Sequence, residues 1–487
     1  MADTHTHTHT HDVVEHTWRE QSAFWPRVAA PVQRLLSSSA AGALLMLAAA
    51  VLAIVWVNAP FGDTYERVWE TPVVLAVGPF DQLSGMTLRD VVSEGLMAIF
   101  FFVVALEIKR ELVAGELRNP RVAALPVIAA LGGMVVPAGI YATLNAGGPG
   151  AHGWGIPMAT DIAFAVAVVT AAGPRVPVAA RVFLLSLAVV DDLGAILVIA
   201  VFYTEGVEVA WLALAAAAVG IAWALARART VRALSPYAAL ALVCWFALHE
   251  SGVHPTIAGV AFGFVTPAWS YYDPRSFGRR ARRLADSADS AWDDAVLTDR
   301  EHAEVHQAMD DMRRLALESR SPLDRLSAAL TGWGTFVIVP LFALASSGLV
   351  LSADVATAWM TNSVSLGIAA GLVVGKTVGV LGSCFVAVRL GVAHMPAGTT
   401  WGQMLGVSTA AGVGFTVALF VSGLSFTDPA LTEAARLGVF SGSVVAGLLG
   451  FTILRLAGRA PAPEPGAEPP SVAAAAGAPD DERLAAG

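Results

Sequence analysis

The sequence has 487 residues, of which 56% are hydrophobic and only 14% are charged, and its mean hydropathy is +0.63. Soluble proteins carry about 25% charged residues, so this composition argues against a soluble globular protein and favours one that spans a membrane. The formal net charge of −9 also excludes a general nucleic-acid binder, which would be basic. Cys244 and Cys384 both lie in apolar runs. We interpret them as packing residues, and we expect no cofactor.

Long apolar runs predict an all-α membrane domain at residues 40–456 with about twelve transmembrane helices. In chain order, the predicted spans are Ala40–Asn58, Val91–Leu106, Val122–Tyr141, Gly155–Ala172, Val182–Phe202, Trp211–Ala226, Tyr237–Leu248, Gly252–Ala268, Phe336–Leu351, Val364–Val388, Met404–Ser425 and Leu437–Leu456. The seventh and eighth spans are short and are separated only by a small polar corner. A charged insert at about 270–330 divides the eighth span from the ninth, and we expect it to be cytoplasmic.

Polar segments flank this domain. Residues 1–39 hold His5, His7, His9 and His11, which alternate with threonine. This tract could bind a metal weakly, but we favour a disordered polar segment, and it does not resemble a cleavable signal peptide. Residues 457–487 are rich in Ala, Pro and Gly and are also predicted to be disordered.

The loop charges predict how the domain is oriented. Arg110, Arg118 and Arg121 follow the second span and Arg389 follows the tenth, whereas the loop at residues 142–154 has no Lys or Arg. Cytoplasmic loops are the ones enriched in Lys and Arg. Both termini are therefore predicted to be cytoplasmic, with the domain in a bacterial inner membrane.

Ionisable side chains interrupt the apolar spans. An ionisable group at the membrane centre costs about 2.5–3.5 kcal/mol, and packing requires none of them, so such residues usually mark a functional site. The residues in question are Asp161, Asp191, Asp192, Lys376, Glu94 and Glu107.

Asp191 and Asp192 are adjacent in SLAVVDDLGAILVIA and point about 100° apart on a helix, so we expect different roles for them. For Asp191, a buried ion pair with Lys376 is as good an interpretation as ion binding, because a membrane lysine needs an opposite charge. No second Lys or intramembrane Arg is available to Asp192. Asp192 is therefore the predicted main cation ligand.

Carboxylate and hydroxyl oxygens suit a small alkali cation such as Na⁺ or Li⁺. In a cavity of low dielectric, a carboxylate can hold either a proton or a cation near neutral pH, because desolvation disfavours its free charged form. If the two ions exclude each other at a site that faces one side at a time, they exchange across the membrane. The residues therefore predict an antiporter rather than an enzyme.

Two spans contain helix-breaking residues. Freed backbone groups are tolerated in a membrane where they line a cavity. These two spans are the fourth span, which is the second of spans three to five, and the eleventh span, which is the second of spans ten to twelve. The two sets of three spans run in opposite directions through the membrane, as inverted repeats do. Close helix packing is an alternative explanation for the glycines of the eleventh span. The residues are Gly155, Pro157, Thr160 and Asp161 in the fourth span, and Gly412, Gly414, Phe415 and Thr416 in the eleventh.

Six segments resemble those of NhaA-type Na⁺/H⁺ antiporters and occur in that family's order: FFFVVALEIKREL, MATDIAFA, SLAVVDDLGAI, SGVHPTIAGV, GLVVGKTVG and GVGFTVALF. The resemblance covers about residues 35–456. It implies a bundle of inverted repeats in which two discontinuous helices cross near the membrane midplane. It also implies a homodimer that exchanges Na⁺ or Li⁺ for H⁺ in pH and sodium homeostasis.

The resemblance further implies roles for single residues. Asp191 and Asp192 would form the Na⁺ site. Asp161 would stand at the positive ends of the broken helices, and Lys376 would stand near their negative ends or pair with Asp191. The remaining matched positions are Thr160, Gly412, Gly414 and Thr416 at the crossing, and Glu107, Glu111, His254 and Glu94 in a cytoplasmic funnel or pH response.

The sequence departs from the family pattern at the cytoplasmic start of the ninth span. RLSAALTGWGTF places Ser327, Ala328, Thr331 and Gly332 where the family has a Glu-His pair and then a His-Pro pair. Ser346 replaces an Asn of the ninth span, and Thr377 stands where Pro is frequent. The residues of the predicted ion site are all present, but the pH-response cluster lacks these titratable side chains.

Three alternatives remain. A membrane-embedded prenyltransferase would need two Asp-rich Mg²⁺ sites, and this chain has a single aspartate pair. A Na⁺-coupled solute symporter on a related fold would need an added pocket, which no sequence feature indicates. A passive channel is disfavoured by the central lysine and the single paired site.

Overall fold

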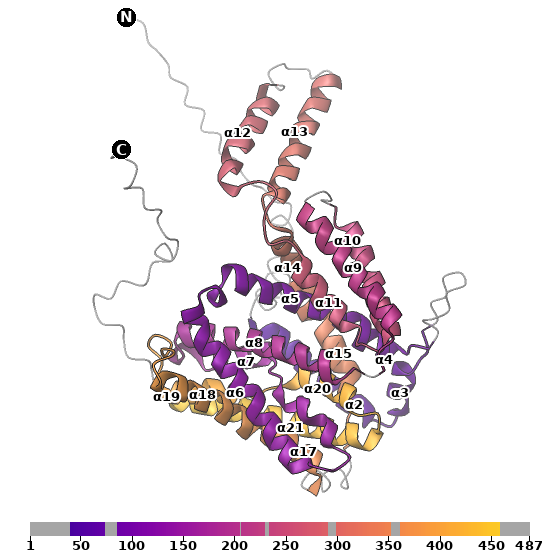
Figure 1. The fold of residues 1–487 in the computed structure, drawn as a ribbon, viewed down its shortest axis with the longest axis vertical. Coiled ribbons are helices and arrows are strands. Elements are labelled where there is room, and N and C mark those ends of the chain that lie inside the picture. The colour runs from indigo at the N-terminus through magenta and orange to yellow at the C-terminus, as the bar shows by residue number, and fades with distance from the viewer. Residues whose placement is uncertain are drawn as a thin grey trace, which may run out of the picture.

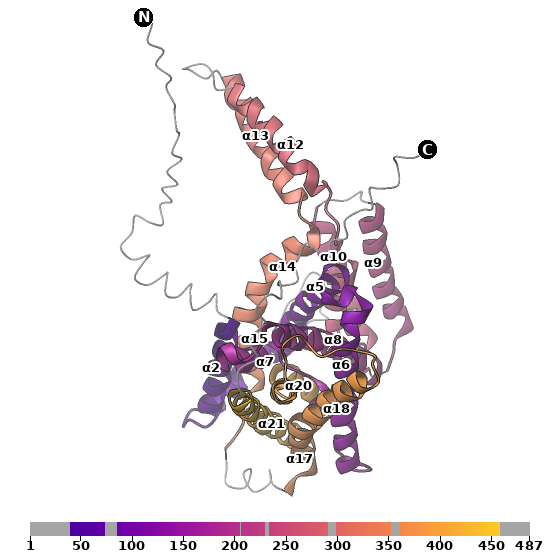
Figure 2. The same cartoon turned by 90° about the vertical axis from the view of Figure 1, so that its left-hand side faces the viewer.

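The computed structural model describes residues 39–73, 85–204, 206–228, 233–290, 299–351 and 361–457. In these ranges every regular element is a helix, and the one extended feature is an isolated bridge between Pro72 and Thr87. The helices form one bundle, from which α12 (Pro274–Ser290) and α13 (Asp299–Glu318) stand away (Figures 1 and 2). The predicted all-α fold is confirmed. Apart from Ser39 and Ala457, the two predicted tails lie outside the described residues.

Each of the twelve predicted places holds a helix or a run of helical segments. The first six are α2 (Ser39–Val57); α4, η3 and α5 (Leu88–Asp90, Val91–Leu96, Met97–Ala114); α6 (Pro120–Asn145); η5 and α7 (Ala151–Met158, Ile162–Ala171); α8 (Val178–Phe202); and α9 (Val209–Ala228). The next six are α10 (Ser235–Ser251); α11 (Thr256–Val265); α14, η7 and α15 (Pro322–Trp333, Gly334–Ile338, Val339–Ser346); α17, η8 and α18 (Ser363–Ala370, Gly371–Gly375, Lys376–Arg389); α19 and α20 (Trp401–Ala410, Phe415–Ser425); and α21 (Pro429–Leu456). Short connecting helices are α3 (Asp63–Trp69), η4 (Glu116–Arg118) and η6 (Gly173–Arg175).

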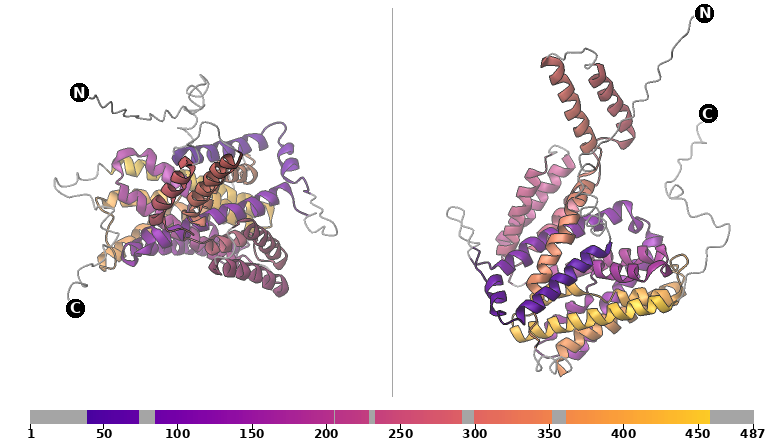
Figure 3. Two further views of the ribbon diagram at one scale, coloured as in Figure 1. Left: turned by 90° about the horizontal axis from the view of Figure 1, so that it is seen from above. Right: turned by 180° about the vertical axis from the view of Figure 1, so that it is seen from behind.

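Several of these helices are long and apolar enough to cross a membrane. By length and composition, seven helices in the described ranges can cross a membrane, or nine if each of two bent pairs is one span. Two shorter apolar helices, Ala41–Val57 and Thr256–Val265, come in addition. From behind, α21 runs along the edge of the bundle beside α19 (Figure 3). The chain is a multi-pass helical membrane protein, and the count of twelve stays a prediction.

The ninth helix begins earlier than its apolar run. It starts at Pro322 and continues through η7 to Ser346, whereas the predicted span starts at Phe336. Ser321 caps its first turn, because the Ser321 hydroxyl accepts a hydrogen bond from the Asp324 amide (3.1 Å). The positions that depart from the family pattern therefore lie on the first turns of a long helix rather than in the charged insert.

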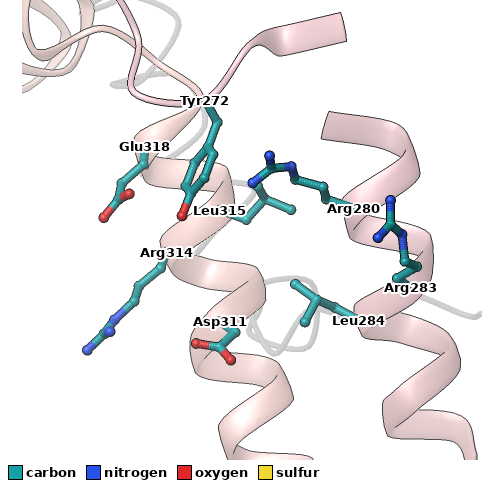
Figure 4. Close-up of a pocket in the computed structure, with 8 residues that line it drawn as sticks. All are labelled: Tyr272, Arg280, Arg283, Leu284, Asp311, Arg314, Leu315 and Glu318. Atoms are coloured by element: carbon teal, nitrogen blue, oxygen red, sulfur yellow. The ribbon is translucent and has the colours of Figure 1, made fainter. Parts of the chain in front are cut away.

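The charged insert folds as a hairpin of α12 and α13. Apolar side chains on facing sides, including Leu284 and the buried Leu315, hold the two helices together. A groove of about 420 Å³ opens between them, and the Arg280 guanidinium lies 4.7 Å from the centre of the Tyr272 ring (Figure 4). Asp311 and further residues of both charge signs line the same groove, as on a solvated surface.

Small residues let the membrane helices approach closely. A side-chain carbon at Gly259 of α11 would overlap the carbonyl oxygen of Ala98 in α5. Gly132 of α6 and Gly379 of α18 face each other, and a side chain on either would overlap the other's carbonyl oxygen. Membrane helices associate through such contacts because lipid provides no hydrophobic force between them. These two contacts fix α5 against α11 and α6 against α18.

Gly259→Val is therefore expected to lower the thermal stability of the detergent-solubilised protein. Overpacking a tight contact costs about 1–3 kcal/mol, and here the obstacle is backbone, which cannot move aside as a flexible side chain would. Tryptophan fluorescence during heating measures the change. Gly220→Val is the matched control, because a carbon added at Gly220 of α9 meets no atom within 4 Å. Equal melting temperatures for the two variants would contradict the close contact between α5 and α11.

Candidate functional site

The two interrupted spans meet at their breaks. The chain bends by 43° between η5 and α7, and by 44° between α19 and α20. The Asp161 amide donates to the Val413 carbonyl (2.6 Å), and the Thr160 hydroxyl donates to the Ala411 carbonyl (2.8 Å). Groups freed at one break are thus satisfied at the other, as a chain surrounded by lipid requires. The prediction of two discontinuous, crossing helices is confirmed, and α20 lies inside the bundle in two perpendicular views (Figures 1 and 2).

Asp161 connects the N-termini of two half-helices. One carboxylate oxygen accepts from the Phe164 amide in α7 (3.2 Å). The other accepts from both the amide and the hydroxyl of Thr416 in α20 (3.1 and 2.6 Å). A helix N-terminus carries a partial positive charge, so one carboxylate stabilises both ends. The side chain is 3% exposed, and water does not compete for these bonds.

Glycines allow the crossing to close. A side-chain carbon at Gly412 would overlap the carbonyl oxygen of Leu372 in the tenth span. At Gly414 it would lie 2.8 Å from the carbonyl oxygen of Ala159, which belongs to the other break. The two explanations given for these glycines, a broken helix and close packing, therefore both apply.

Lys376 pairs with Asp191 in the centre of the protein. The Lys376 ammonium donates to Asp191 Oδ2 at 2.6 Å, and both side chains are at most 1% exposed. Lys376 follows directly on η8, a π-helical turn at Gly371–Gly375. Such turns hold one residue more than an α-helical turn and are frequent at functional sites. Of the two positions expected for Lys376, the structure shows the one beside Asp191.

Asp192 lies next along α8, and among the described residues no hydrogen bond or salt bridge joins it to the lysine. Its Oδ1 atom is buried without a hydrogen-bond partner among the described residues, and the same holds for Oδ1 of Asp191. Burying a carboxylate oxygen without a partner is costly, so these atoms are suited to bind a proton or a cation. The described residues hold no cluster of three or more His, Cys, Asp or Glu side chains that could bind a metal ion.

The protein encloses this site. Asp191 and Thr160 are 0% exposed and Asp192 is 4% exposed. Since the surrounding helices alone produce this burial, neither side of the membrane has open access to the carboxylates in this conformation.

The four residues of the predicted funnel or pH response form two groups. Glu107 and Glu111 lie one turn apart on α5, whereas Glu94 lies in η3, about 20 Å back along the same span at 1.5 Å per residue. His254 belongs to the Glu94 end, and its ring packs edge-to-face on Phe420 of α20 at 5.2 Å. The four side chains therefore do not meet at one place, and their role in ion access or pH response stays a prediction.

His249 of α10 is not predicted from the sequence. Its Nδ1 atom lies 3.0 Å from Glu94 Oε2, and its ring stacks on Trp245. Trp245 Nε1 donates to the Glu94 carbonyl (3.1 Å), which lies in the π-helical turn η3. The signal available in the sequence is that Glu94 needs a partner, and His249 in the segment HESGVH is a candidate for it.

A second polar cluster, also not predicted, joins α21 to the end of α15. Arg436 Nη1 donates to the Gly348 carbonyl (3.2 Å). The Tyr65 hydroxyl lies 2.8 Å from the Leu344 carbonyl and accepts from the Gly348 amide (3.1 Å). Burial raises the pKa of Tyr65 to about 12, so the hydroxyl remains a donor at all physiological pH values. Arg436 is not predicted from the sequence because it precedes the apolar run of the twelfth span, whereas the helix α21 itself already starts at Pro429.

The residues that depart from the family pattern are satisfied locally. The Thr331 hydroxyl donates to the Ser327 carbonyl (2.8 Å), and Ala328 is exposed. The Thr377 hydroxyl donates to the Val373 carbonyl within η8 (2.6 Å). None of these side chains titrates near neutral pH.

Comparison with known proteins agrees with this geometry. The sequence matches the model of the family described as Na⁺/H⁺ antiporter 1 over residues 33–454. It is 43% identical over 442 residues to a Na(+)/H(+) antiporter NhaA of Oleidesulfovibrio alaskensis, which covers 90% of this chain and 96% of the relative. It is 44% identical over 436 residues to a Na(+)/H(+) antiporter NhaA 2 of Myxococcus xanthus, covering 88% and 90%. The protein therefore belongs to the Na⁺/H⁺ antiporter 1 family.

Proposed function

We propose that this protein exchanges Na⁺ for H⁺ across the bacterial inner membrane and that Asp191 and Asp192 bind the two ions in turn. Family membership supports the exchange itself and does not favour an enzyme, a symporter or a channel. The observation that carries the site assignment is a pair of adjacent buried carboxylates, each with one oxygen that has no hydrogen-bond partner in the part of the chain that the structure describes.

Exchange follows from competition at these oxygens. Protonation neutralises a buried carboxylate, and so does a bound Na⁺, but the same oxygen cannot take both. Hard oxygen ligands match Na⁺, and they match Li⁺ for the same reason, so Li⁺ is proposed as a second substrate. The Thr160 hydroxyl donates its hydrogen to the Ala411 carbonyl, so its oxygen keeps lone pairs that are available to a cation in addition to the carboxylates.

Asp161 and Thr416 hold the two broken spans together at their crossing. By accepting hydrogen bonds from α7 and α20, Asp161 offsets the partial positive charge of both helix ends. Without it, these ends would repel an incoming cation. We assign Asp161, Thr160, Thr416, Gly412 and Gly414 this supporting role.

Lys376 gives Asp191 a counter-charge when no cation is bound. The two groups are completely buried, so each would be strongly destabilised without the other. A cation that binds Asp191 must compete with the ammonium, whereas one that binds Asp192 need not. This difference supports Asp192 as the main ligand.

The enclosed site requires a conformational change, because ions reach 0–4% exposed carboxylates only if helices move apart. We propose that the site opens alternately to each side. The arginine-rich loops support cytoplasmic termini and a cytoplasmic insert at about 270–330. We also propose that residues 1–39 and 457–487 are cytoplasmic tails and that the protein assembles as a homodimer. We assign Glu107, Glu111, Glu94 and His254 to ion access or pH response.

Asp192→Asn and Asp191→Asn are each expected to abolish exchange without preventing membrane insertion. An amide has nearly the same shape but cannot trade a proton for a cation. Everted vesicles measure this directly, since added Na⁺ dissipates an imposed pH gradient only if exchange occurs. Asp63→Asn, at an exposed aspartate outside the spans, is the control. Na⁺-driven proton movement by purified Asp192→Asn in proteoliposomes would disprove the site assignment.

Lys376→Ala is expected to reduce both stability and exchange. Removing one partner of a buried ion pair typically costs about 3–5 kcal/mol, because the other charge is left uncompensated. Heating in detergent should show a lower melting temperature, and Lys376→Arg should recover more than Lys376→Gln. Combining Lys376→Gln with Asp191→Asn should restore stability but not exchange. An unchanged melting temperature for Lys376→Ala would show that the pair contributes nothing to folding.

The pH dependence is expected to lie mainly in the apparent KM for Na⁺. Protons compete with Na⁺ for the same oxygens, so the apparent KM rises as pH falls, while the rate at saturating Na⁺ changes little. Proteoliposome rates over a matrix of Na⁺ concentration and pH separate these two parameters. Ser327→Glu combined with Ala328→His and Thr331→His should add a steeper pH dependence at saturating Na⁺. A steep fall of the wild-type maximal rate between alkaline and neutral pH would instead require another sensor, such as His254 or Glu107.

A further inference from the structure

The first half of the fourth span is η5 (Ala151–Met158), a 3₁₀ helix of eight residues that ends at the break beside the ion site. Such helices rarely exceed about three or four residues because their hydrogen bonds have poorer geometry, and a long one often marks a hinge or a segment under strain. The loop that leads into η5 has no Lys or Arg, so η5 lies on the extracytoplasmic side in the proposed orientation. Its last four residues are buried, and it packs against α6, α8 and α20. On that side, η5 therefore covers the ion site.

Tyr203 at the end of α8 holds η5 by its backbone. The Tyr203 hydroxyl donates to the His152 carbonyl (2.9 Å) and accepts from the Gly155 amide (3.2 Å). A side-chain carbon at Gly155 would lie 2.7 Å from this hydroxyl, so the glycine permits the close approach. Tyr203 is 8% exposed, which limits the competition of water for the two bonds. One side chain therefore joins the outer half of the broken span to the helix that carries the aspartate pair.

Tyr203 also lies on the Asp192 face of α8. The two residues are eleven positions apart, which is about 1100° at 100° per residue, so their side chains leave the helix within about 20° of each other. The Tyr203 amide still donates to the Ile199 carbonyl (3.2 Å), so the helical geometry extends to the tyrosine. Between them this face carries Ala195 and Ile199, which are 5% and 2% exposed. A buried face thus leads from Tyr203 to the predicted main cation ligand.

The position of η5 also affects the lysine side of the site. A side-chain carbon at Gly371, the first residue of the π-helical turn before Lys376, would lie 2.6 Å from the Pro157 side chain of η5. Beyond the end of η5, the Thr160 hydroxyl donates to the Ala411 carbonyl of the other break. A displacement of η5 would therefore reach both broken spans and the turn that carries the lysine through direct contacts.

We propose that Tyr203 is a positioning residue of the exchange cycle, and that its bonds to η5 keep the extracytoplasmic route to Asp192 closed. Release of these bonds frees η5 to move off the buried face of α8, and the ion site then opens to that side. Tyr203 contacts neither ion and acts only through the position of η5. The direction of opening rests on the orientation given with the proposed function.

The test measures access to a cysteine on the covered face. In a full-length chain with Cys244→Ala and Cys384→Ala, Ala195→Cys places a thiol between Tyr203 and Asp192. A membrane-impermeant, cationic methanethiosulfonate is added to right-side-out vesicles in Na⁺-free buffer. Tyr203→Phe keeps the ring but removes both hydrogen bonds. It is expected to raise the labelling rate about fivefold, which corresponds to a net loss of about 1 kcal/mol.

Tyr65→Phe is the matched control. The Tyr65 hydroxyl also lies between a carbonyl and an amide, those of Leu344 and Gly348, but its bonds join α3 to the end of α15 rather than to η5. Tyr65→Phe should leave the labelling of Ala195→Cys unchanged. An equal rise in Tyr65→Phe and Tyr203→Phe, or no rise in Tyr203→Phe, would overturn the proposal.

A second reporter separates opening on one side from general loosening. Ala188→Cys lies one turn from Asp192 toward the cytoplasmic end of α8, at a residue that is 0% exposed. In everted vesicles, Tyr203→Phe should not raise its labelling by the same reagent. If labelling rises equally at both reporters, Tyr203 merely stabilises the bundle and the proposal is wrong.

Exchange kinetics give an independent measurement. In everted vesicles, Tyr203→Phe should raise the apparent KM for Na⁺ more than it lowers the maximal rate, because a smaller fraction of the protein faces the cytoplasm. A lower maximal rate at an unchanged apparent KM would contradict the proposal. Labelling does not require exchange, so the two proposals can fail separately. Normal exchange without a labelling difference refutes the role of Tyr203, whereas a labelling difference without any Na⁺/H⁺ exchange in wild type refutes the proposed function alone.

Discussion

Two helices of this protein stop inside the membrane, and each peptide group freed at those stops needs a partner that lipid cannot supply. Asp161 meets much of this need, because its carboxylate accepts from the N-termini of both α7 and α20. The breaks then satisfy each other through the Asp161–Val413 and Thr160–Ala411 bonds. The glycines, the buried lysine and the aspartate pair are all arranged around this joint. An ion site is possible here because backbone groups freed at one break find partners at the other.

Much of this arrangement could be predicted from local sequence. Helix breaks are visible as Gly and Pro within apolar runs, and Asp161, Asp191, Asp192 and Lys376 stand out because charge is costly in a membrane. The partners of these residues could not be predicted in the same way. Asp161 and Thr416 are 255 positions apart, and only the packing of α7 against α20 brings them together. The His249–Glu94 pair depends likewise on which helices are neighbours, which hydropathy does not record.

The starts of two helices are also not predicted correctly from the sequence, and the physical reason is the same for both. The ninth helix begins at Pro322 and the twelfth helix at Pro429, each some turns before its apolar run. Both first turns are polar, so hydropathy places the helix start too late. The capping residues Ser321 and Asp428, each followed by Pro at the first helical position, mark the true starts. A helix that extends beyond the membrane is better delimited by its caps than by its hydropathy.

The π-helical turn at Gly371–Gly375 also sets the register of everything that follows it in the tenth span. The turn takes up one residue more than an α-helical turn would. If the same residues adopted a regular α-helix, every later side chain of α18 would be displaced by one position, or about 100°. The Lys376 ammonium would then point away from Asp191, although the lysine itself was unchanged. Gly379 would leave Gly132 at the same time, because it lies on the same helix. Substitutions that favour a regular α-helix in this segment would therefore be damaging although they touch neither Lys376 nor Asp191, since the wide turn itself brings the lysine to its aspartate.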